Sequence, residues 1–167
     1  MSKFYFHSFC DYRDDEKLAE LNTTDGLEIP MLICIDNYAE VADMKEGYCY
    51  IDVMGIGKNV EVYPTIEAFK CSHEGVHYIS MIPIGSFSLK EDDEDFEKSP
   101  RILFSGILRA FERNVSAEED EPNVCLTVET LEFTVNFLTH YDGDLDVGYI
   151  VCGSAFLYGD LIPDEEE

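Results

Sequence analysis

Apolar and polar positions alternate through much of the second half of the chain. One alternating run covers residues 124–128 and another covers residues 133–137, with a break near residues 129–132 between them. Alternation with a period of two, in segments rich in β-branched and aromatic residues, is typical of strands with one buried face. The pattern therefore predicts an antiparallel hairpin here, and further strands over residues 101–112 and 148–158.

The first half contains more apolar runs and few segments with helical character. Strands are expected over residues 29–35, 47–53, 59–69 and 76–89, and a glycine-rich turn is expected at residues 54–58. Good helix formers without β-branched crowding gather only in residues 14–21 and 38–45, each about two turns long. The predicted fold class is mainly β (α+β minor), with antiparallel strands forming a barrel or sandwich and one or two short helices.

Charge is distributed unevenly and suggests how the chain is organised. Residues 1–90 carry 15 acidic and 7 basic side chains, whereas residues 91–167 carry 21 acidic and 4 basic ones. The acidic segment at residues 91–100 ends in Ser-Pro, which cannot form an inner strand. We therefore expect a β-rich first half (1–90), an acidic loop or linker (91–100), a barrel region (101–162) and an acidic tail (163–167). One continuous domain is the alternative.

The segment from residue 102 to residue 161 resembles a small Greek-key barrel of the OB type. The resemblance rests on FSGILRAFERN, on CLTVETLEFTVNFL and on DVGYIVCGSAFLYGDLI. Gly106 stands where the first strand of such barrels bends, and Val147-Gly148-Tyr149-Ile150-Val151 matches the start of a late strand. The resemblance implies a five-stranded barrel with a binding surface on its second and third strands.

Composition argues against the ligand that such barrels often bind. The chain of 167 residues has 36 acidic and 11 basic side chains, a net charge of −25, and has no Lys or Arg after Arg113. Phe133, Phe137 and Tyr141 offer aromatic rings, but binding to nucleic acid or to an anionic membrane requires basic residues. We therefore expect no nucleic-acid or membrane partner.

The acidic runs are the candidate binding residues. Clustered carboxylates steer basic partners into contact, although they also serve simply to keep a β-rich protein in solution. The sequence therefore predicts a non-enzymatic interaction module that engages a basic protein. The residues expected to bind it are Glu91, Asp92, Asp93, Glu94, Asp95, Glu118, Glu119, Asp120 and Glu121.

One short motif suggests a different class of function. His73, Glu74 and His77 match H-E-x-x-H, which binds zinc in hydrolases when it lies on a helix. Gly75 and the flanking β-branched residues favour a turn, and in a strand the two histidines would lie about 13 Å apart. A metal-dependent hydrolase is thus the alternative hypothesis, and a small-ligand-binding barrel is a second alternative. The main interpretation includes no catalytic residue, metal or cofactor.

Cysteine usage and the first residues bear on the compartment. The six cysteines are widely spaced without a C-x-x-C pair, and four of them lie in apolar runs. The first residues contain no apolar segment of the secretory type, and no apolar stretch reaches the roughly 18 residues of a membrane span. We expect a cytoplasmic protein with reduced thiols.

Overall fold

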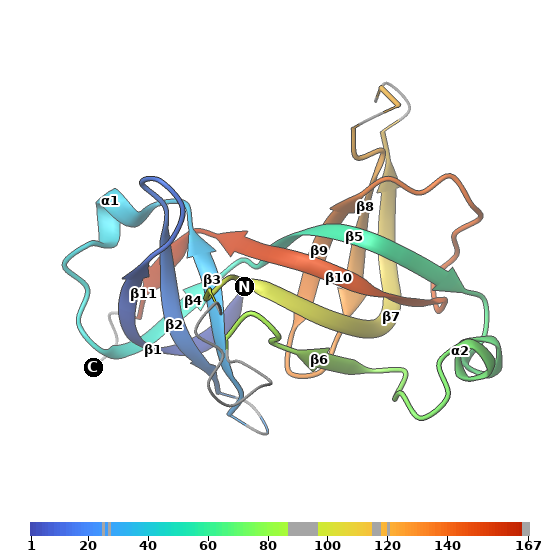
Figure 1. Cartoon of the computed structure of the whole chain (residues 1–167), viewed down its shortest axis with the longest axis horizontal. Coiled ribbons are helices and arrows are strands. Elements are labelled where there is room, and N and C mark those ends of the chain that lie inside the picture. Colours follow the sequence, from blue (N-terminus) through green and yellow to red (C-terminus); the bar gives the residue numbers. More distant parts are fainter. Residues whose placement is uncertain (25, 27, 87–96, 115–117, 120, 165–167) are drawn as a thin grey trace. The chain divides into compact units, whose positions relative to one another are not determined.

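The computed structural model describes residues 1–24, 26, 28–86, 97–114, 118–119 and 121–164, which form eleven strands and two helices (Figure 1). In chain order the elements are β1 (Ser2–Asp11), β2 (Lys17–Thr23), β3 (Pro30–Ile35), α1 (Tyr38–Val41), β4 (Gly47–Ile51), β5 (Met54–Tyr63), α2 (Ile66–Ser72), β6 (Ser80–Ile82), β7 (Arg101–Arg113), β8 (Val124–Glu129), β9 (Thr134–Thr139), β10 (Ile150–Gly159) and β11 (Leu161–Pro163). The predicted fold class is confirmed. Within these residues, neither helix approaches the length and apolar character needed to cross a bilayer.

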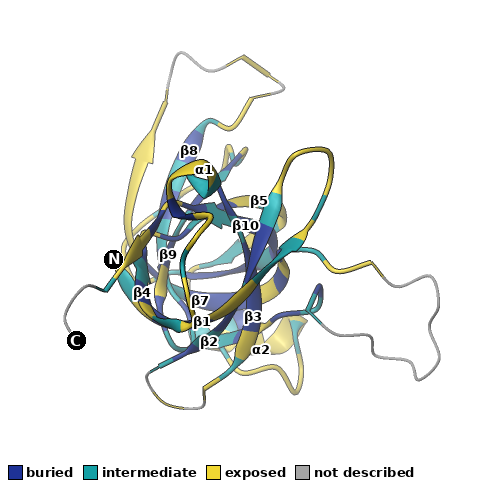
Figure 2. Cartoon of the chain, turned by 90° about the vertical axis from the view of Figure 1, so that its left-hand side faces the viewer, coloured by how far each residue is buried: buried dark blue, intermediate teal, exposed yellow. Residues whose placement is uncertain are grey.

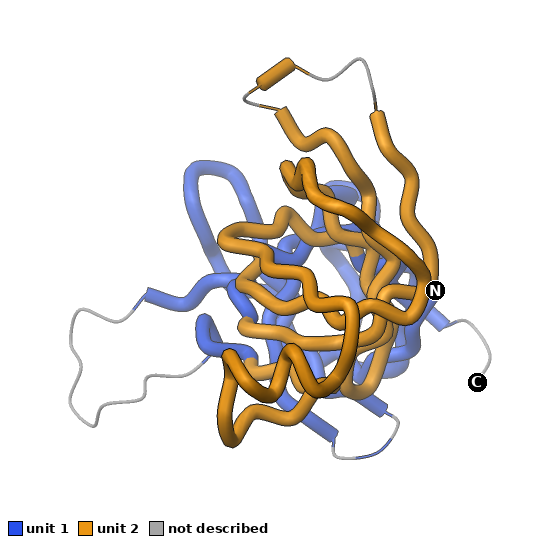
Figure 3. The backbone as a smooth tube through the Cα atoms, turned by 90° about the vertical axis from the view of Figure 1, so that its right-hand side faces the viewer, with its two compact units in different colours: residues 1–53, 83–102, 156–167 blue, residues 54–82, 103–155 orange. Residues whose placement is uncertain are grey.

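The chain forms two compact units that interleave in sequence (Figure 3). Unit 1 comprises Met1–Val53, Pro83–Ile102 and Phe156–Glu167, and unit 2 comprises Met54–Ile82 and Leu103–Ala155. Neither unit coincides with the halves 1–90 and 101–162 expected from charge. Charge reports which segments are solvated, whereas a unit is defined by which strands pair.

Unit 2 contains a closed five-stranded barrel. Strands β7, β8 and β9 form an antiparallel meander, β5 runs parallel to β9, and β10 neighbours both β5 and β7 and so closes the ring. The short strand β6 is an addition on the open side of β7. A barrel was expected within residues 102–161, but its fifth strand, β5, comes from the first half of the chain.

Alternation of side chains explains why these strands close on themselves. The predicted hairpin is confirmed as β8 and β9, paired from Val124↔Thr139 to Glu129↔Thr134. Every second residue of β8 is buried. Figure 2 shows the buried residues of the strands in dark blue. The Phe104 and Phe137 rings stack with centroids 4.1 Å apart. Burial of such aromatic and branched side chains is the main favourable contribution to folding.

Gly106 allows a close approach inside this barrel. It lies in β7 between the residues that pair with β6 and those that pair with β8. A Cβ atom at this position would lie 2.3 Å from the carbonyl oxygen of Glu129 and 2.7 Å from Cγ1 of Val128. Only glycine fits there without moving the neighbouring strand.

Unit 1 has the same order of strands. Strands β1, β2 and β3 form an antiparallel meander, and β4 pairs antiparallel with β1. Tyr158 and Gly159 at the end of β10 pair in parallel with β3, and β11 then pairs with β4. The last strand of unit 1 thus comes from the second half of the chain.

Several local predictions were wrong. Residues 14–21 were expected to form a helix, but Asp14 has a positive φ of 48° and strand β2 follows, with Leu18 and Leu21 buried. Pairing with two neighbouring strands outweighs the weak helix propensity of this segment. The expected turn at 54–58 is part of β5.

The expected strand at 59–69 is divided, because β5 ends at Tyr63 and Thr65 caps helix α2, its hydroxyl accepting a hydrogen bond from the backbone N–H of Ala68 at 3.0 Å. A strand was expected over residues 76–89. Within the described residues only β6 forms there, and residues 87–89 lie outside them. Of the helix expected over 38–45, only α1 forms.

The interleaving predicts how the chain responds to being cut. A fragment of residues 1–90 lacks the strand that completes unit 1, and a fragment of residues 91–167 lacks β5 of unit 2. Each fragment then exposes an unpaired strand edge, and the barrel of unit 2 is left open. We expect neither fragment alone to show near-UV circular dichroism of the folded protein, and a mixture of the two to recover it. Cooperative thermal unfolding of either isolated fragment would contradict this account.

Candidate functional site

The acidic residues expected to bind a partner lie in connecting segments. Residues 91–95 and Asp120 lie outside the described residues. Glu118, Glu119 and Glu121 are exposed in the connection between β7 and β8, where the backbone N–H of Glu121 donates to the carbonyl of Glu118 at 3.1 Å. These three side chains do not line the pocket of unit 1 that is described below, and their part in binding stays a prediction.

The H-E-x-x-H segment does not form a helix. Helix α2 ends at Ser72, and His73 occupies its C-cap with φ −128° and ψ 63°. Gly75 then adopts a φ of +83°, and the backbone N–H of Val76 donates to the carbonyl of His73. His77 contacts the backbone of Ile79 instead of sharing a site with His73. The geometry that the hydrolase hypothesis requires is therefore not formed at these residues.

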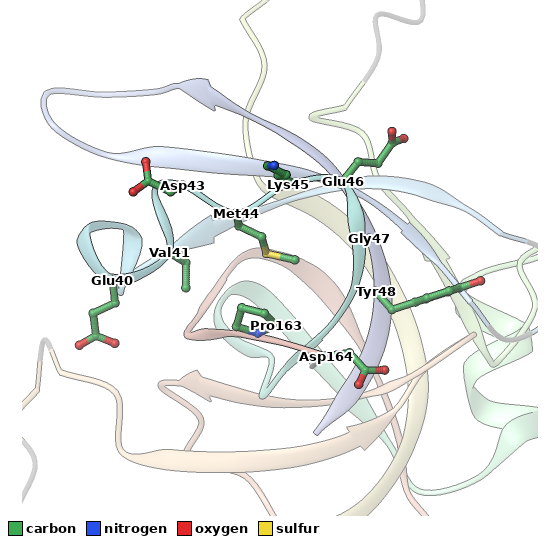
Figure 4. A pocket seen from close by; sticks show the side chains of 10 residues that line it. All are labelled: Glu40, Val41, Asp43, Met44, Lys45, Glu46, Gly47, Tyr48, Pro163 and Asp164. Carbon is green, nitrogen blue, oxygen red and sulfur yellow. The ribbon is translucent and has the colours of Figure 1, made fainter. Parts of the chain in front are cut away.

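A pocket of about 540 Å³ lies within unit 1 (Figure 4). It is formed by the end of α1, the segment that leads into β4, and the end of β11. The side chains of Val41, Met44 and Pro163 lie toward its middle, and carboxylates surround them (Figure 4). The volume falls in the range of small-ligand sites, roughly 300–1,000 Å³.

The charges that line this pocket are strongly unbalanced. Four carboxylates, those of Glu40, Asp43, Glu46 and Asp164, are accompanied by a single lysine, Lys45. Glu46 lies 3.3 Å from Nδ1 of His7, and Asp164 lies 3.9 Å from Nζ of Lys3. Glu40 and Asp43 form no ion pair with any described residue. The pocket therefore presents a negative rim around an apolar floor.

Aromatic rings adjoin the pocket along β1 and β4. Phe4 and Phe6 of β1 are buried, so Lys3, Tyr5 and His7 project to the other face of the strand. The Tyr5 ring packs edge-on against Tyr48, with centroids 5.2 Å apart. Burial raises the pKa of Tyr5, and the charge of Glu46 adds to that shift.

Lys3 shows which chemistry this surface accommodates. Its Nζ atom lies 4.6 Å from the ring centroid of Tyr48, and the same atom approaches the carboxylate of Asp164. Tyr48 and Asp164 both line the pocket. A cation between a tyrosine face and a carboxylate is a recurring arrangement for binding ammonium and guanidinium groups.

A second group of chemically active side chains lies in unit 2. Glu61 and Tyr63 project from β5, His73 from the end of α2, and Cys152 from β10. Nε2 of His73 lies 3.0 Å from Oε2 of Glu61, 3.6 Å from Sγ of Cys152 and 3.2 Å from the Tyr63 hydroxyl. The tyrosine hydroxyl donates a hydrogen bond to Glu61.

The protonation behaviour of this cluster follows from its contacts. Hydrogen bonds from Tyr63 and His73 lower the pKa of Glu61, and the bond to Glu61 raises the pKa of Tyr63. Burial, with a smaller effect from the charge of Glu61, raises the pKa of Cys152 to about 11. The thiol is therefore protonated at neutral pH.

This geometry does not match a cysteine nucleophile with its base. In such relays the imidazole contacts the thiol through one ring nitrogen and an acid through the other. Here Oε2 of Glu61 and Sγ of Cys152 both lie beside the same atom, Nε2 of His73. The raised thiol pKa also opposes formation of a thiolate.

Sequence reasoning identified His73 but missed the residues around it. Glu61 and Tyr63 are two positions apart in a strand, so they share a face, but this part was assigned to a strand without a site. Cys152 is 79 residues away from His73 in the sequence. Only the pairing of β5 with β10 brings it near.

Thiol reactivity tests the placement of the cysteines. All six are free; Cys71 is exposed, whereas Cys49 and Cys152 are buried with pKa values raised to about 12 and about 11. At pH 7 a thiol of pKa 11 is ionised in only about one molecule in ten thousand. We expect iodoacetamide in EDTA-containing buffer to modify Cys71 first and to leave Cys49 and Cys152 unmodified until denaturation, as measured by peptide mass spectrometry. Equal rates at Cys71 and Cys152 in the folded protein would be inconsistent with the structure.

Comparisons with protein-family profiles, with curated proteins and with solved structures find no match for this chain.

Proposed function

We propose that this protein is a non-enzymatic binding protein for a basic protein partner, and that the pocket of unit 1 receives a Lys or Arg side chain of that partner. The observation that carries the proposal is the pocket itself, with four carboxylates, one lysine and an adjoining tyrosine whose ring already holds the ammonium group of Lys3.

The shape of the pocket supports a long basic side chain as the ligand. Lys and Arg have an aliphatic stem that packs on apolar surface and a charged head that stays near water or carboxylates. Val41, Met44 and Pro163 supply the apolar surface, and Glu40 and Asp43 supply carboxylates without a described ion-pair partner. An anionic ligand would be repelled by the same rim.

The charge of the whole chain supports the same class of partner. A net charge of −25 attracts basic molecules from a distance and raises their rate of encounter, an effect that salt weakens. The ion pairs that Lys and Arg form within the described part of the chain include those with Asp164, Asp11, Glu20 and Glu129. The acidic connection that contains Glu118 and Glu119 would add to this attraction without forming the pocket.

We interpret the barrel as OB-like, which is compatible with a binding role. Barrels of this type bind ligands on an outer strand surface and in adjoining loops, and the protein that carries them need not be an enzyme. Their frequent use with nucleic acids does not extend to this chain, since no Lys or Arg follows Arg113. The order of strands that both units share is consistent with this interpretation.

Removing Lys3 should strengthen binding of a basic peptide. Lys3→Met frees Tyr48 and Asp164 for the peptide. The two contacts that Lys3 makes with them, a cation–π interaction and a partly exposed ion pair, are worth roughly a three- to tenfold change in affinity. Lys70→Met removes the same charge from an exposed position on α2 and should change affinity by no more than about twofold. The measurement is calorimetric titration with octalysine at low salt, repeated at high salt.

A second pair of variants separates the pocket from the acidic connection. Glu40→Gln with Asp43→Asn should weaken octalysine binding more than Glu118→Gln with Glu119→Gln, although both pairs remove two charges. Equal weakening by the two pairs, or equal effects of Lys3→Met and Lys70→Met, would show that binding depends only on net charge. The pocket would then not be the binding site.

A further inference from the structure

We propose that Glu61, His73 and Cys152 of unit 2 form a binding site for a divalent transition-metal ion of the zinc type. This inference is independent of the proposed partner binding, because it rests on other residues in the other unit.

The spacing of the three side chains fits shared coordination. Their ligand atoms all lie within 4.8 Å of one another. Zinc bonds of about 2.3 Å to sulfur and about 2.05 Å to nitrogen, at the tetrahedral angle, place the two ligand atoms about 3.6 Å apart. Sγ of Cys152 and Nε2 of His73 are 3.6 Å apart, and the 3.0 Å between Nε2 and Oε2 of Glu61 requires only a small outward shift of an exposed side chain.

The kinds of donor atom determine which ion the site would take. A thiolate together with an imidazole favours zinc, cobalt or copper, whereas magnesium and calcium prefer oxygen ligands alone. Among the residues that the structure describes, Glu61, His73 and Cys152 are the group of three His, Cys, Asp or Glu ligand atoms that lie close enough together to share one ion. Binding of the metal would release the proton from the Cys152 thiol.

The neighbours of the cluster hold its ligands in position. The His73 ring stacks on the buried ring of Phe69, with centroids 5.1 Å apart and planes 22° apart. The Tyr63 hydroxyl hydrogen-bonds Glu61, and its ring meets His73 edge-on at 5.6 Å. Hydrogen bonds to ligating side chains commonly contribute 10–100-fold to metal affinity. Tyr63 is therefore a positioning residue.

The degree of burial suggests a partly open site. Cys152 is 7% exposed, whereas the side chains of His73 and Glu61 are 33% and 55% exposed. The sulfur thus forms the inner wall and the carboxylate the outer one. Three protein ligands leave a fourth position for water or another ligand, as in zinc sites that are not purely structural.

The test is a titration of the metal-free protein with Co²⁺, followed by competition with Zn²⁺. Tetrahedral coordination by a thiolate gives intense visible bands and a sulfur-to-cobalt charge-transfer band. We expect one equivalent to bind and Zn²⁺ to abolish the bands. Cys152→Ser should remove the charge-transfer band, and Cys71→Ser, which alters an exposed cysteine outside the cluster, should leave it unchanged.

Further variants keep the test valid if Cys152→Ser fails to fold. His73→Gln and Glu61→Gln alter side chains that are at least partly exposed, so both variants should fold. We expect His73→Gln to weaken Co²⁺ binding more than about 100-fold and Glu61→Gln to weaken it about 10-fold or more. We expect Tyr63→Phe to weaken it about 10-fold. His77→Gln should have no effect, since His77 lies outside the cluster. Absence of stoichiometric binding, or equal weakening by His73→Gln and His77→Gln, would overturn the proposal.

Discussion

The parallel pairing that completes each unit is the constraint on which the rest of the structure depends. In unit 2, β5 lies parallel to β9, and in unit 1 the end of β10 lies parallel to β3. Parallel neighbours cannot be joined by a tight turn, so each completing strand must arrive from a distant part of the chain. Here it arrives from the other half of the sequence.

Both candidate groups of side chains include residues that arrive from the other half of the sequence. The pocket of unit 1 uses Pro163 and Asp164, and the backbone N–H of Asp164 donates to the carbonyl of Tyr48 at 3.0 Å. The cluster of unit 2 uses Glu61 and Tyr63, which lie on β5. Without the long-range pairing, the pocket and the cluster would each lack some of their residues. Each site is therefore assembled only when the chain folds.

The sequence predicted the fold class better than it predicted the sites, for a physical reason. Alternation is a local property, so it identified β8, β9 and most of β7 and β10 and the presence of a barrel. It failed at β2, where Asp14–Leu21 has residues typical of helices, because strand pairing overrides local propensity. His73 was singled out for its neighbours Glu74 and His77, whereas its contacts are with residues 12 and 79 positions away. Such distances are decided by register, which no local pattern contains.

The two candidate sites differ in what they would select from the same electrostatic field. A net charge of −25 concentrates every kind of cation near the protein, organic or metallic. Selection then depends on the atoms at close range. The pocket offers carboxylates, apolar surface and the face of Tyr48, which suit an extended organic cation. The cluster offers sulfur and nitrogen beside one carboxylate, which suit a transition metal. The acidic composition would therefore attract cations in general, and the few uncharged or weakly basic groups at each candidate site would decide which cation it retains.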